Sequence, residues 1–363
     1  MQEQKHRSTC NVSFTRNDLA RTKLGKDQCP VKNCTIDVKR YSVPYNQKTK
    51  VPFCPEHGIR IHTNGFVYYN GPSPEDLELS VRRNLMFHGD FYVNHFLGHN
   101  NRGNKIESGR LCYENSEDAV TYNVFSELLA HGNPLKKLAS NLTDRDVIDA
   151  VELYLWGGKI DLENDRFVPY NPLSEVRKSL ELDIYPFVTE PDIMLIVPDK
   201  VLICIEAKLG SKNPPARDAQ ERPGEKPQSH QGLIQRYCKE NTIIPDEIAE
   251  IFDFSSQRQP FYGQIFRNIV FAAAMSKLEE IPEWYVVNLR NQHVMHLRQG
   301  RPEAMPVVRN VRSFLRGEYK QRFIHRTWEN IFDRVIKGDE QLADLSWYMK
   351  TKSLNCGRAF NCF

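Results

Sequence analysis

The chain has 363 residues, of which 40% are hydrophobic and 26% charged, and its formal net charge is +3. This composition is typical of an ordinary globular protein of about two domains. The sequence has no run of 18 apolar residues and begins with the polar segment MQEQKHRSTC. These features argue against a membrane-spanning or exported protein, and we expect a cytoplasmic one without a membrane partner. Nine cysteines, an odd number, likewise argue against a disulfide framework.

Positive charge is concentrated in two stretches of the chain. Residues 1–26 carry six lysines and arginines against two acids, and residues 301–326 carry seven against two. Such stretches suit a polyanionic partner, although a basic stretch is more often only a solvated face.

Two close pairs of metal-binding residue types lie near the amino terminus. The segment DQCPVKNC supplies Cys29 and Cys34, and PFCPEHG supplies Cys54 and His57. Three thiols and an imidazole suit tetrahedral Zn²⁺, and because all four positions are then filled, the zinc would be structural. The region is also too polar to build its own core, for which metal is a substitute. We expect a small zinc ribbon over residues 25–65 that docks or grips nucleic acid.

Other assignments of these residue types stay open. The three cysteines can be free thiols beside a surface histidine, because a Cys-x4-Cys spacing is looser than the common one. Cys10 is a weaker substitute ligand. His62 is a further candidate, but it lies at the end of GIRIH, which alternates like a strand, and so falls outside the turn that holds Cys54 and His57. Cys204 lies in an apolar run and is most simply a core residue. Cys356 and Cys362 receive no role.

Two helices are predicted before the middle of the chain. PEDLELSVRRNLMF begins one, and NSEDAVTYNVFSELLAHG is a second, with Asn115 or Ser116 as its cap and Gly132 at its end. The core-facing stripe of the second helix is expected to contain Glu117, Thr121, Val124 and Leu128. Taken alone, Glu117 is most simply a first-turn partner of the helix dipole, and Glu127 lies on a solvated face.

The second half of the chain is predicted to contain a long loop, helices and late strands. Segment 209–232 has no periodicity and is dense in Pro, Gly and charge, which indicates a lid over substrate or a disordered loop. QPFYGQIFRNIVFAAAMSKL is an amphipathic helix with Gln264, Arg267 and Asn268 on one side. EWYVVNL and HVMHL are typical of strands, and WENIFDRVIKGDEQLADLSWYMKTK of a carboxy-terminal helix.

The stretch TEPDIMLIVPDKVLICIEAKLG contains two apolar runs with charged residues at their ends. If the runs pair as a hairpin with a three- or five-residue loop, side-chain alternation places Asp192 opposite Glu206. Lys208 then shares their face, above an apolar floor, whereas a two-residue loop would put Asp192 on the other face. The simpler alternative is a hairpin whose strand ends carry solvated charge.

Carboxylates that converge in this way repel one another unless a cation lies between them. Hard oxygen ligands left half-filled by water suit Mg²⁺, so Asp192 and Glu206 are the expected metal ligands. The ammonium group of Lys208 can stabilise developing charge or help to deprotonate a water molecule. Glu190 shares the same face and is the rival of Asp192.

The letters PD at 191–192, followed after an apolar strand by EAK at 206–208, resemble the motif of the PD-(D/E)xK nucleases, the restriction-endonuclease-like superfamily. The resemblance implies hydrolysis of a DNA phosphodiester with Mg²⁺ or Mn²⁺ on an αβββαβ core. It also implies that Glu117, in the position of a helix-borne acid, completes the metal site, and that Gln264 in FYGQIFRN is a further catalytic residue. FCPEHGIRIHTNGFVYYN and NSEDAVTYNVF are similar to bacterial restriction-type nucleases with an amino-terminal zinc ribbon, which implies restriction or anti-phage defence.

The predicted fold is α/β: a restriction-endonuclease-like αβββαβ core with a mixed sheet flanked by helices, preceded by a small zinc ribbon. The expected domains are an arm and ribbon over 1–75, a nuclease core over 76–300, and a basic, mostly helical extension over 301–363 packed on the core. The predicted function is a metal-dependent DNA endonuclease. A nucleic-acid-binding module with an inactive nuclease fold, and a nuclease of RNA or branched DNA, stay as alternatives, and a homodimer is left open.

Overall fold

The computed structural model describes residues 18–19, 28–45, 49–62, 65–68, 74–96, 110–180, 190–209, 237, 241–253, 262–292, 304–355 and 362. The chain divides into two compact units, residues 1–127 with 336–363 and residues 128–335, and each unit has its own sheet. Within the described ranges, no helix is long and apolar enough to cross a membrane.

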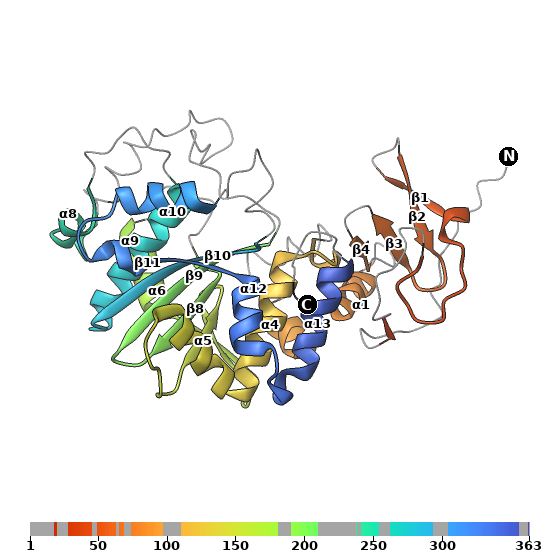
Figure 1. Cartoon of the computed structure of the whole chain (residues 1–363), viewed down its shortest axis with the longest axis horizontal. Coiled ribbons are helices and arrows are strands. Elements are labelled where there is room, and N and C mark those ends of the chain that lie inside the picture. Colours follow the sequence, from red (N-terminus) through yellow and green to blue (C-terminus); the bar gives the residue numbers. More distant parts are fainter. Residues whose placement is uncertain are drawn as a thin grey trace. The chain divides into compact units, whose positions relative to one another are not determined.

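The first unit contains a four-stranded antiparallel sheet (Figure 1). Its strands, in spatial order, are β1 (Ser42–Tyr45), β2 (Thr49–Cys54), β3 (Ile59–His62) and β4 (Gly65–Val67). A 3-10 turn, η2 (Val38–Arg40), precedes them and is capped by the side chain of Asp37, which accepts a hydrogen bond from Lys39 N at 3.2 Å. Apolar residues are few here: the buried cluster of this region contains nine described residues, and two of them are cysteines.

The helices of the first unit are α1 (Pro74–Asn84), α2 (Gly89–Phe96), η3 (Arg110–Cys112), most of α4 (Glu117–His131), η6 (Glu340–Leu342) and α13 (Ala343–Asn355). α1 and α4 confirm two predicted helices. Ser116 Oγ accepts a hydrogen bond from Ala119 N at 3.3 Å at the start of α4, and Gly132 follows its end with a φ of +68°. The solvated face predicted for Glu127 is wrong, because α4 is buried around most of its circumference. The Glu127 side chain is only 12% exposed and lies 3.5 Å from Nε2 of His88.

The second unit contains a seven-stranded mixed sheet in the spatial order β11-β10-β9-β8-β5-β6-β7. The strands are β5 (Glu152–Leu155), β6 (Gly158–Asp161), β7 (Arg166–Pro169), β8 (Ile193–Val197), β9 (Val201–Lys208), β10 (Glu283–Arg290) and β11 (Phe323–Thr327). Neighbouring strands from β7 to β9 pair antiparallel, whereas β9, β10 and β11 run parallel. The carboxyl ends of these three strands therefore meet at one edge of the sheet, which is a common place for functional groups in α/β proteins.

Helices flank this sheet. They are α5 (Asn133–Thr143), α6 (Asn171–Leu180), α8 (Glu247–Ile251), α9 (Gly263–Leu278), α10 (Ala304–Ser313), α11 (Tyr319–Arg322) and α12 (Trp328–Ile331). α9 packs against β9 and β10 (Figure 1). Its apolar side chains share one buried cluster with Met194 of β8, Cys204 of β9 and Val286 of β10. Burial of this face is what holds the hairpin end of the sheet in place.

The α/β architecture with a mixed sheet flanked by helices is confirmed. EWYVVNL forms β10 and the helix that carries Gln264 is α9, while HVMHL, the arm over 1–17 and the loop over 210–232 lie outside the described residues. The basic stretch 301–326 contains a strand that the sequence does not predict, β11, which forms because parallel pairing with β10 buries Phe323 and Ile324.

The single carboxy-terminal helix expected over 328–352 is wrong. α12 continues into a π-helical turn, η5 (Phe332–Ile336), and Gly338, with a φ of +82°, separates this turn from η6 and α13. A glycine in the left-handed region is a common end of a helix, and it divides this periodic segment. The expected extension 301–363 is thus shared between the two units.

Candidate functional site

The β8–β9 hairpin sets the geometry of the first candidate site. The strands pair in a register that leaves residues 198–200 as a three-residue loop. In this loop, Asp199 takes the left-handed φ of +59° that the tight turn requires. The same register, continued by one pair, confirms that Asp192 lies opposite Glu206 on one face of the hairpin.

Asp192, Glu206 and Lys208 converge at the end of this hairpin. Lys208 Nζ contacts Glu206 Oε1 and lies 3.9 Å from Asp192 Oδ2. Asp192 Oδ2 also accepts a hydrogen bond from Ala207 N at 2.9 Å, which fixes this carboxylate against β9. Among the residues that the structure describes, Asp192 Oδ1 has no hydrogen-bond partner, and the side chain is 22% exposed.

Glu206 is fully buried and held by two amides of α9. Gln264 Nε2 donates to Glu206 Oε1 at 2.5 Å, and Asn268 Nδ2 donates to Oε2 at 2.9 Å. Burial, followed by the nearby Asp192 carboxylate, raises the pKa of Glu206 to about 8, and the Lys208 ammonium opposes this shift. The buried carboxyl group therefore holds its proton more tightly than an exposed glutamate does.

Asn268 is a residue of this site to which the sequence prediction gives no role. It is 1% exposed, and its Oδ1 has no hydrogen-bond partner among the described residues. Its spacing of four residues from Gln264 places the two amides on the same side of α9, and this spacing was the signal available in the sequence. A buried acceptor of this kind is costly unless water or a cation satisfies it.

Two further predicted acids lie elsewhere. Glu190 is 2.9 Å from Nη2 of Arg177 on α6, so its charge has a partner outside the group around Asp192. Glu117 lies in the first turn of α4, where the helix dipole favours an acid. Its contribution to the metal site stays a prediction, because Glu117 and Asp192 belong to different units.

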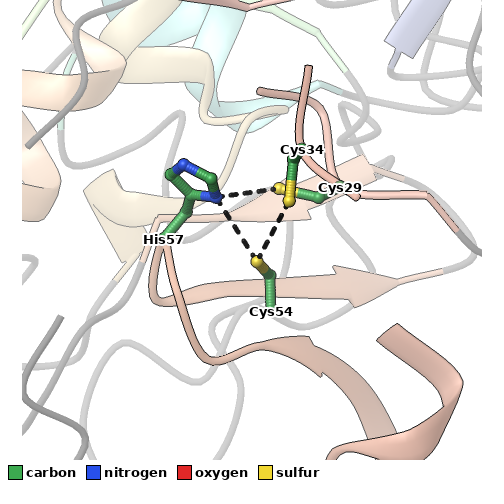
Figure 2. A group of neighbouring side chains, drawn as sticks. All are labelled: Cys29, Cys34, Cys54 and His57. Atoms are coloured by element: carbon green, nitrogen blue, oxygen red, sulfur yellow. Dashed lines mark hydrogen bonds between the residues drawn. The ribbon is translucent and has the colours of Figure 1, made fainter. Parts of the chain in front are cut away.

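The four predicted zinc ligands come together in the second candidate site (Figure 2). Cys29 and Cys34 lie in the loop before η2, Cys54 ends β2, and His57 lies in the turn between β2 and β3. The N–H of Gly58 closes that turn by donating to Cys54 O at 2.9 Å. Gly58 has a φ of +66°, which few other residues adopt without strain. All four ligand atoms lie within 4.8 Å of one another.

Three of the separations within this cluster are close to the edges of a tetrahedron around zinc. His57 Nδ1 is 3.6 Å from Cys29 Sγ and 3.4 Å from Cys54 Sγ, and Cys34 Sγ is 3.8 Å from Cys54 Sγ. Bond lengths of about 2.3 Å to sulfur and about 2.0–2.1 Å to nitrogen give edges of about 3.8 Å and about 3.5 Å. The cluster could therefore hold a zinc ion with every position filled by protein.

Contacts inside the cluster also favour a thiolate. The hydrogen bond from Cys29 and, to a smaller extent, that from His57 lower the pKa of Cys54 to about 5 despite its burial. The same contact with Cys54 raises the pKa of Cys29. Of the alternative ligands, Cys10 lies outside the described residues, and only the backbone of His62, at the end of β3, is described.

Comparisons with known proteins return no match: no protein-family model, curated protein or solved structure is similar to this chain. Inferences about function therefore depend on the geometry of the two candidate sites. They also depend on the resemblance of the pattern formed by Asp192, Glu206 and Lys208 to the PD-(D/E)xK motif.

Proposed function

We propose that this chain is a PD-(D/E)xK-type endonuclease that hydrolyses DNA phosphodiester bonds with Mg²⁺ or Mn²⁺. The observation that supports the proposal is the convergence of Asp192, Glu206 and Lys208 at one end of a hairpin, with Gln264 bonded to Glu206. The strand order agrees with an αβββαβ core made of α5, β5, β8, β9, α9 and β10. In that assignment β6, β7 and α6 are inserted between the first and second strands.

The donors of the site fit a hard divalent cation. Asp192 Oδ1 and the carboxylate of Glu206 are oxygen ligands, and Asn268 Oδ1 adds a buried oxygen without a partner among the described residues. When bound, the ion would polarise a phosphoryl oxygen and lower the pKa of a water molecule. The amides of Gln264 and Asn268 hold Glu206 in the orientation that keeps its carboxylate beside Asp192.

In this proposal, Lys208 stabilises negative charge on the phosphate during hydrolysis. Its Nζ borders both carboxylates, and its side chain is 12% exposed, so a phosphate oxygen that reaches the carboxylates also reaches the ammonium group. During hydrolysis a water oxygen forms a bond to phosphorus, the bond to the leaving oxygen breaks, and the leaving oxygen takes up a proton. The Lys208 ammonium stabilises the negative charge that builds up on the phosphoryl oxygens.

The Cys/His cluster has a different task in this proposal. A zinc ion with four protein ligands has no open position for substrate, so the ribbon around it supports structure and contact with nucleic acid. A setting in bacterial restriction or anti-phage defence is carried by the motif resemblance alone.

The test is a cleavage panel of linear, supercoiled, single-stranded and modified DNA and of RNA, each with Mg²⁺ and with EDTA. We expect Mg²⁺-dependent cleavage of DNA by the parent protein and a loss of about 10²- to 10⁴-fold in Lys208→Ala. Lys200→Ala is the matched control, because Lys200 lies on the same hairpin, is 58% exposed and pairs with Asp149 instead. Cleavage of RNA alone would assign an RNA nuclease, and DNA binding without cleavage by the parent would assign a binding module.

A further inference from the structure

The basic stretch after residue 301 has no part in the proposed catalytic site. Between residues 304 and 322 the chain carries five lysines and arginines against one acid, Glu318. This segment forms α10, a short connection and α11, and then enters β11. α10 lies beside α9 in Figure 1 and shares its buried cluster. The positive charge therefore belongs to helices packed on the second unit.

α10 separates apolar side chains from basic ones. Val307 and Val311 are 3% and 6% exposed and belong to the buried cluster that contains α9. Arg309 and Arg312 are exposed. Residues three apart lie on the same side of a helix, so the two guanidinium groups share the side of α10 that faces the solvent.

The buried side of α10 lies against the half of α9 that carries the amides of the candidate catalytic site. Val311 lines one small apolar cavity together with Phe266 and Ile269 of α9. Gln264 and Asn268, which hold the buried glutamate of that site, lie within one turn of these two residues. The exposed side of α10 is therefore one helix away from groups of the proposed catalytic site.

Backbone carbonyl groups fix two of the exposed arginines. Arg312 Nη2 donates to Phe323 O at 3.2 Å, and Arg316 Nε donates to Phe252 O at 2.9 Å. The Arg316 side chain is nevertheless 56% exposed. A guanidinium group has five N–H donors, so one such bond fixes the side chain and leaves donors for an anion.

Arg322 is held by two aromatic rings. Its Cζ lies 5.1 Å from the centre of the Trp284 ring and 5.0 Å from that of Tyr319, and the two rings are themselves stacked. Stacking uses the flat face of the guanidinium group, whereas phosphate oxygens bind at its edge. A cation fixed in this way loses little freedom when an anion binds.

Neighbouring acids compensate only part of this charge. Asp253 lies 4.0 Å from Arg316 Nη2, and Glu250 and Glu318 interact electrostatically with Tyr319. Three cations of the segment have no ion-pair partner among the described residues: Arg309, Arg312 and Lys320. All three are exposed, and unpaired cations that share one surface attract a polyanion.

We propose that the exposed cations of α10, α11 and their connection form a basic face that binds the phosphate backbone of a polynucleotide. The residues of this basic face are Arg309, Arg312, Arg316, Lys320 and Arg322. The choice of partner rests on the proposed nuclease function. Four of the five are arginines, whose planar groups match phosphate oxygens. An anionic membrane fits less well, because none of the large apolar side chains described as exposed belongs to α10 or α11.

The test measures DNA affinity without divalent metal, so that binding is separated from cleavage. A fluorescent duplex is titrated with protein in EDTA at several KCl concentrations, and the slope of log K against log [KCl] reports the number of phosphates neutralised. Arg309→Gln and Lys320→Gln should each reduce the magnitude of this slope by up to about 0.9 and weaken binding by up to roughly tenfold at low salt. The loss should be the same for duplexes of unrelated sequence, because phosphate contacts carry no sequence information.

Two further variants are controls. Arg309→Lys keeps the charge and should keep the slope. Arg166→Gln removes an exposed cation from β7, at the opposite edge of the sheet from β11, against which α10 packs. It should change neither the slope nor the affinity. Thermal melting should be the same for all four variants, because each replaces an exposed side chain.

The results separate the basic face from the nuclease function. Unchanged slopes in both Arg309→Gln and Lys320→Gln overturn the basic face, even if the parent cleaves DNA. So does an equal reduction in Arg166→Gln, which would report overall charge alone, or a parent that binds no polynucleotide. Tighter binding of the parent to anionic phospholipid vesicles than to DNA, lost in the two variants, would assign a membrane surface instead. A parent that binds DNA with the predicted slopes but cleaves none with Mg²⁺ overturns the nuclease function and leaves the basic face standing.

Discussion

The two units bury polar groups for different reasons. Around the Cys/His cluster of the first unit, the described buried cluster has nine residues, and Cys29 and Cys54 are themselves part of this core. In the second unit, one described cluster contains 32 buried residues, and Asp192 and Lys208 lie at the end of strands above it. The Cys/His cluster takes the place of hydrophobic burial in stabilising the first unit. The second unit is already stabilised by its apolar core, so the polar groups at the sheet edge are not needed for its stability. Substitutions in the Cys/His cluster should therefore unfold the protein locally. Substitutions of the polar groups at the sheet edge should remove activity and leave the fold intact.

A buried ion pair extends this contrast within the first unit. Lys352 of α13 lies 3.1 Å from Glu114 Oε2, both side chains are 0% exposed, and Lys352 Nζ also donates to Asn84 Oδ1 at 3.0 Å. The neighbouring Arg83 donates from Nη1 to the carbonyl oxygen of His57 at 3.2 Å. Polar contacts thus link the Cys/His cluster to α1, and α1 to α13.

Removal of zinc is expected to give the largest difference in stability between the two units. Purified protein should contain about one zinc per chain, and structural zinc sites contribute roughly 10–16 kcal/mol of apparent binding free energy. In Cys54→Ser or after chelation, hydrogen exchange should show lost protection over residues 49–62 and unchanged protection over 193–208. Cys204→Ala, which removes a buried thiol of the second unit, is the control for zinc content. Full zinc content in Cys54→Ser would contradict the assignment of the ligands.

Loss of the buried ion pair should have the second-largest effect on stability. Lys352→Met leaves Glu114 buried without its cation, which typically costs about 3–5 kcal/mol. We expect denaturant unfolding of the first unit at a correspondingly lower midpoint, with the second unit unaffected. Lys350→Met, on an exposed position of the same helix, should change stability by less than about 0.5 kcal/mol. Equal effects of the two substitutions would mean that the pair contributes nothing specific.

The protonation of Glu206 should make metal binding depend on pH. Because burial raises the pKa of Glu206 to about 8, a cation that binds below that pH must displace a proton. The apparent affinity for Mn²⁺ should rise by up to roughly tenfold per pH unit between about pH 6 and 8 and then level off. Folding stability in the absence of metal depends on pH in the opposite direction. The raised pKa of Glu206 stabilises the fold below its ordinary pKa of 4.5, and this contribution is lost as pH rises towards 8. Calorimetric titration measures the protons released, and a pH-independent affinity would refute this linkage.

Glu117 should give the smallest effect. If it supports the metal site, Glu117→Ala lowers cleavage by less than Asp192→Ala does, because helix-borne acids in such sites act through secondary or water-mediated contacts. Asp118→Ala is the matched control: it removes the other acid from the first turn of α4 and costs only the dipole contribution of about 0.3–1 kcal/mol. Identical cleavage by the two variants would leave Glu117 with the dipole role alone.

Local patterns explain which parts of the fold and the site were predictable. The parity of the hairpin follows from alternation and loop length, so the position of Asp192 opposite Glu206 can be read from 20 or so residues. The zinc ligands follow from two short spacings in the same way, and the helix cap at Ser116 from one residue type.

Long-range packing explains what could not be predicted. β11 exists because β10 lies beside it, and nothing within FIHRT distinguishes it from the basic stretch around it. Lys352 meets Asn84 across 268 positions of sequence, which no local pattern reveals. Asn268 lay on the predicted face of α9, but its role depends on the arrival of Glu206 from another strand.

The most direct test of the central claim, that Asp192 and Glu206 bind the metal and Lys208 acts on the phosphate, is a matched set of alanine variants. Mn²⁺ binding, DNA binding and DNA cleavage are measured on each. We expect Asp192→Ala and Glu206→Ala to lose Mn²⁺ binding and cleavage without weaker DNA binding. Asp192→Ala removes a charge that repels phosphate, and Glu206, whose pKa is raised to about 8, carries little charge near pH 7 in the absence of metal. Lys208→Ala should keep most of its Mn²⁺ affinity and lose cleavage by about 10²- to 10⁴-fold. If all three variants cleave DNA like the parent, the catalytic assignment is wrong, and a nucleic-acid-binding module becomes the better assignment.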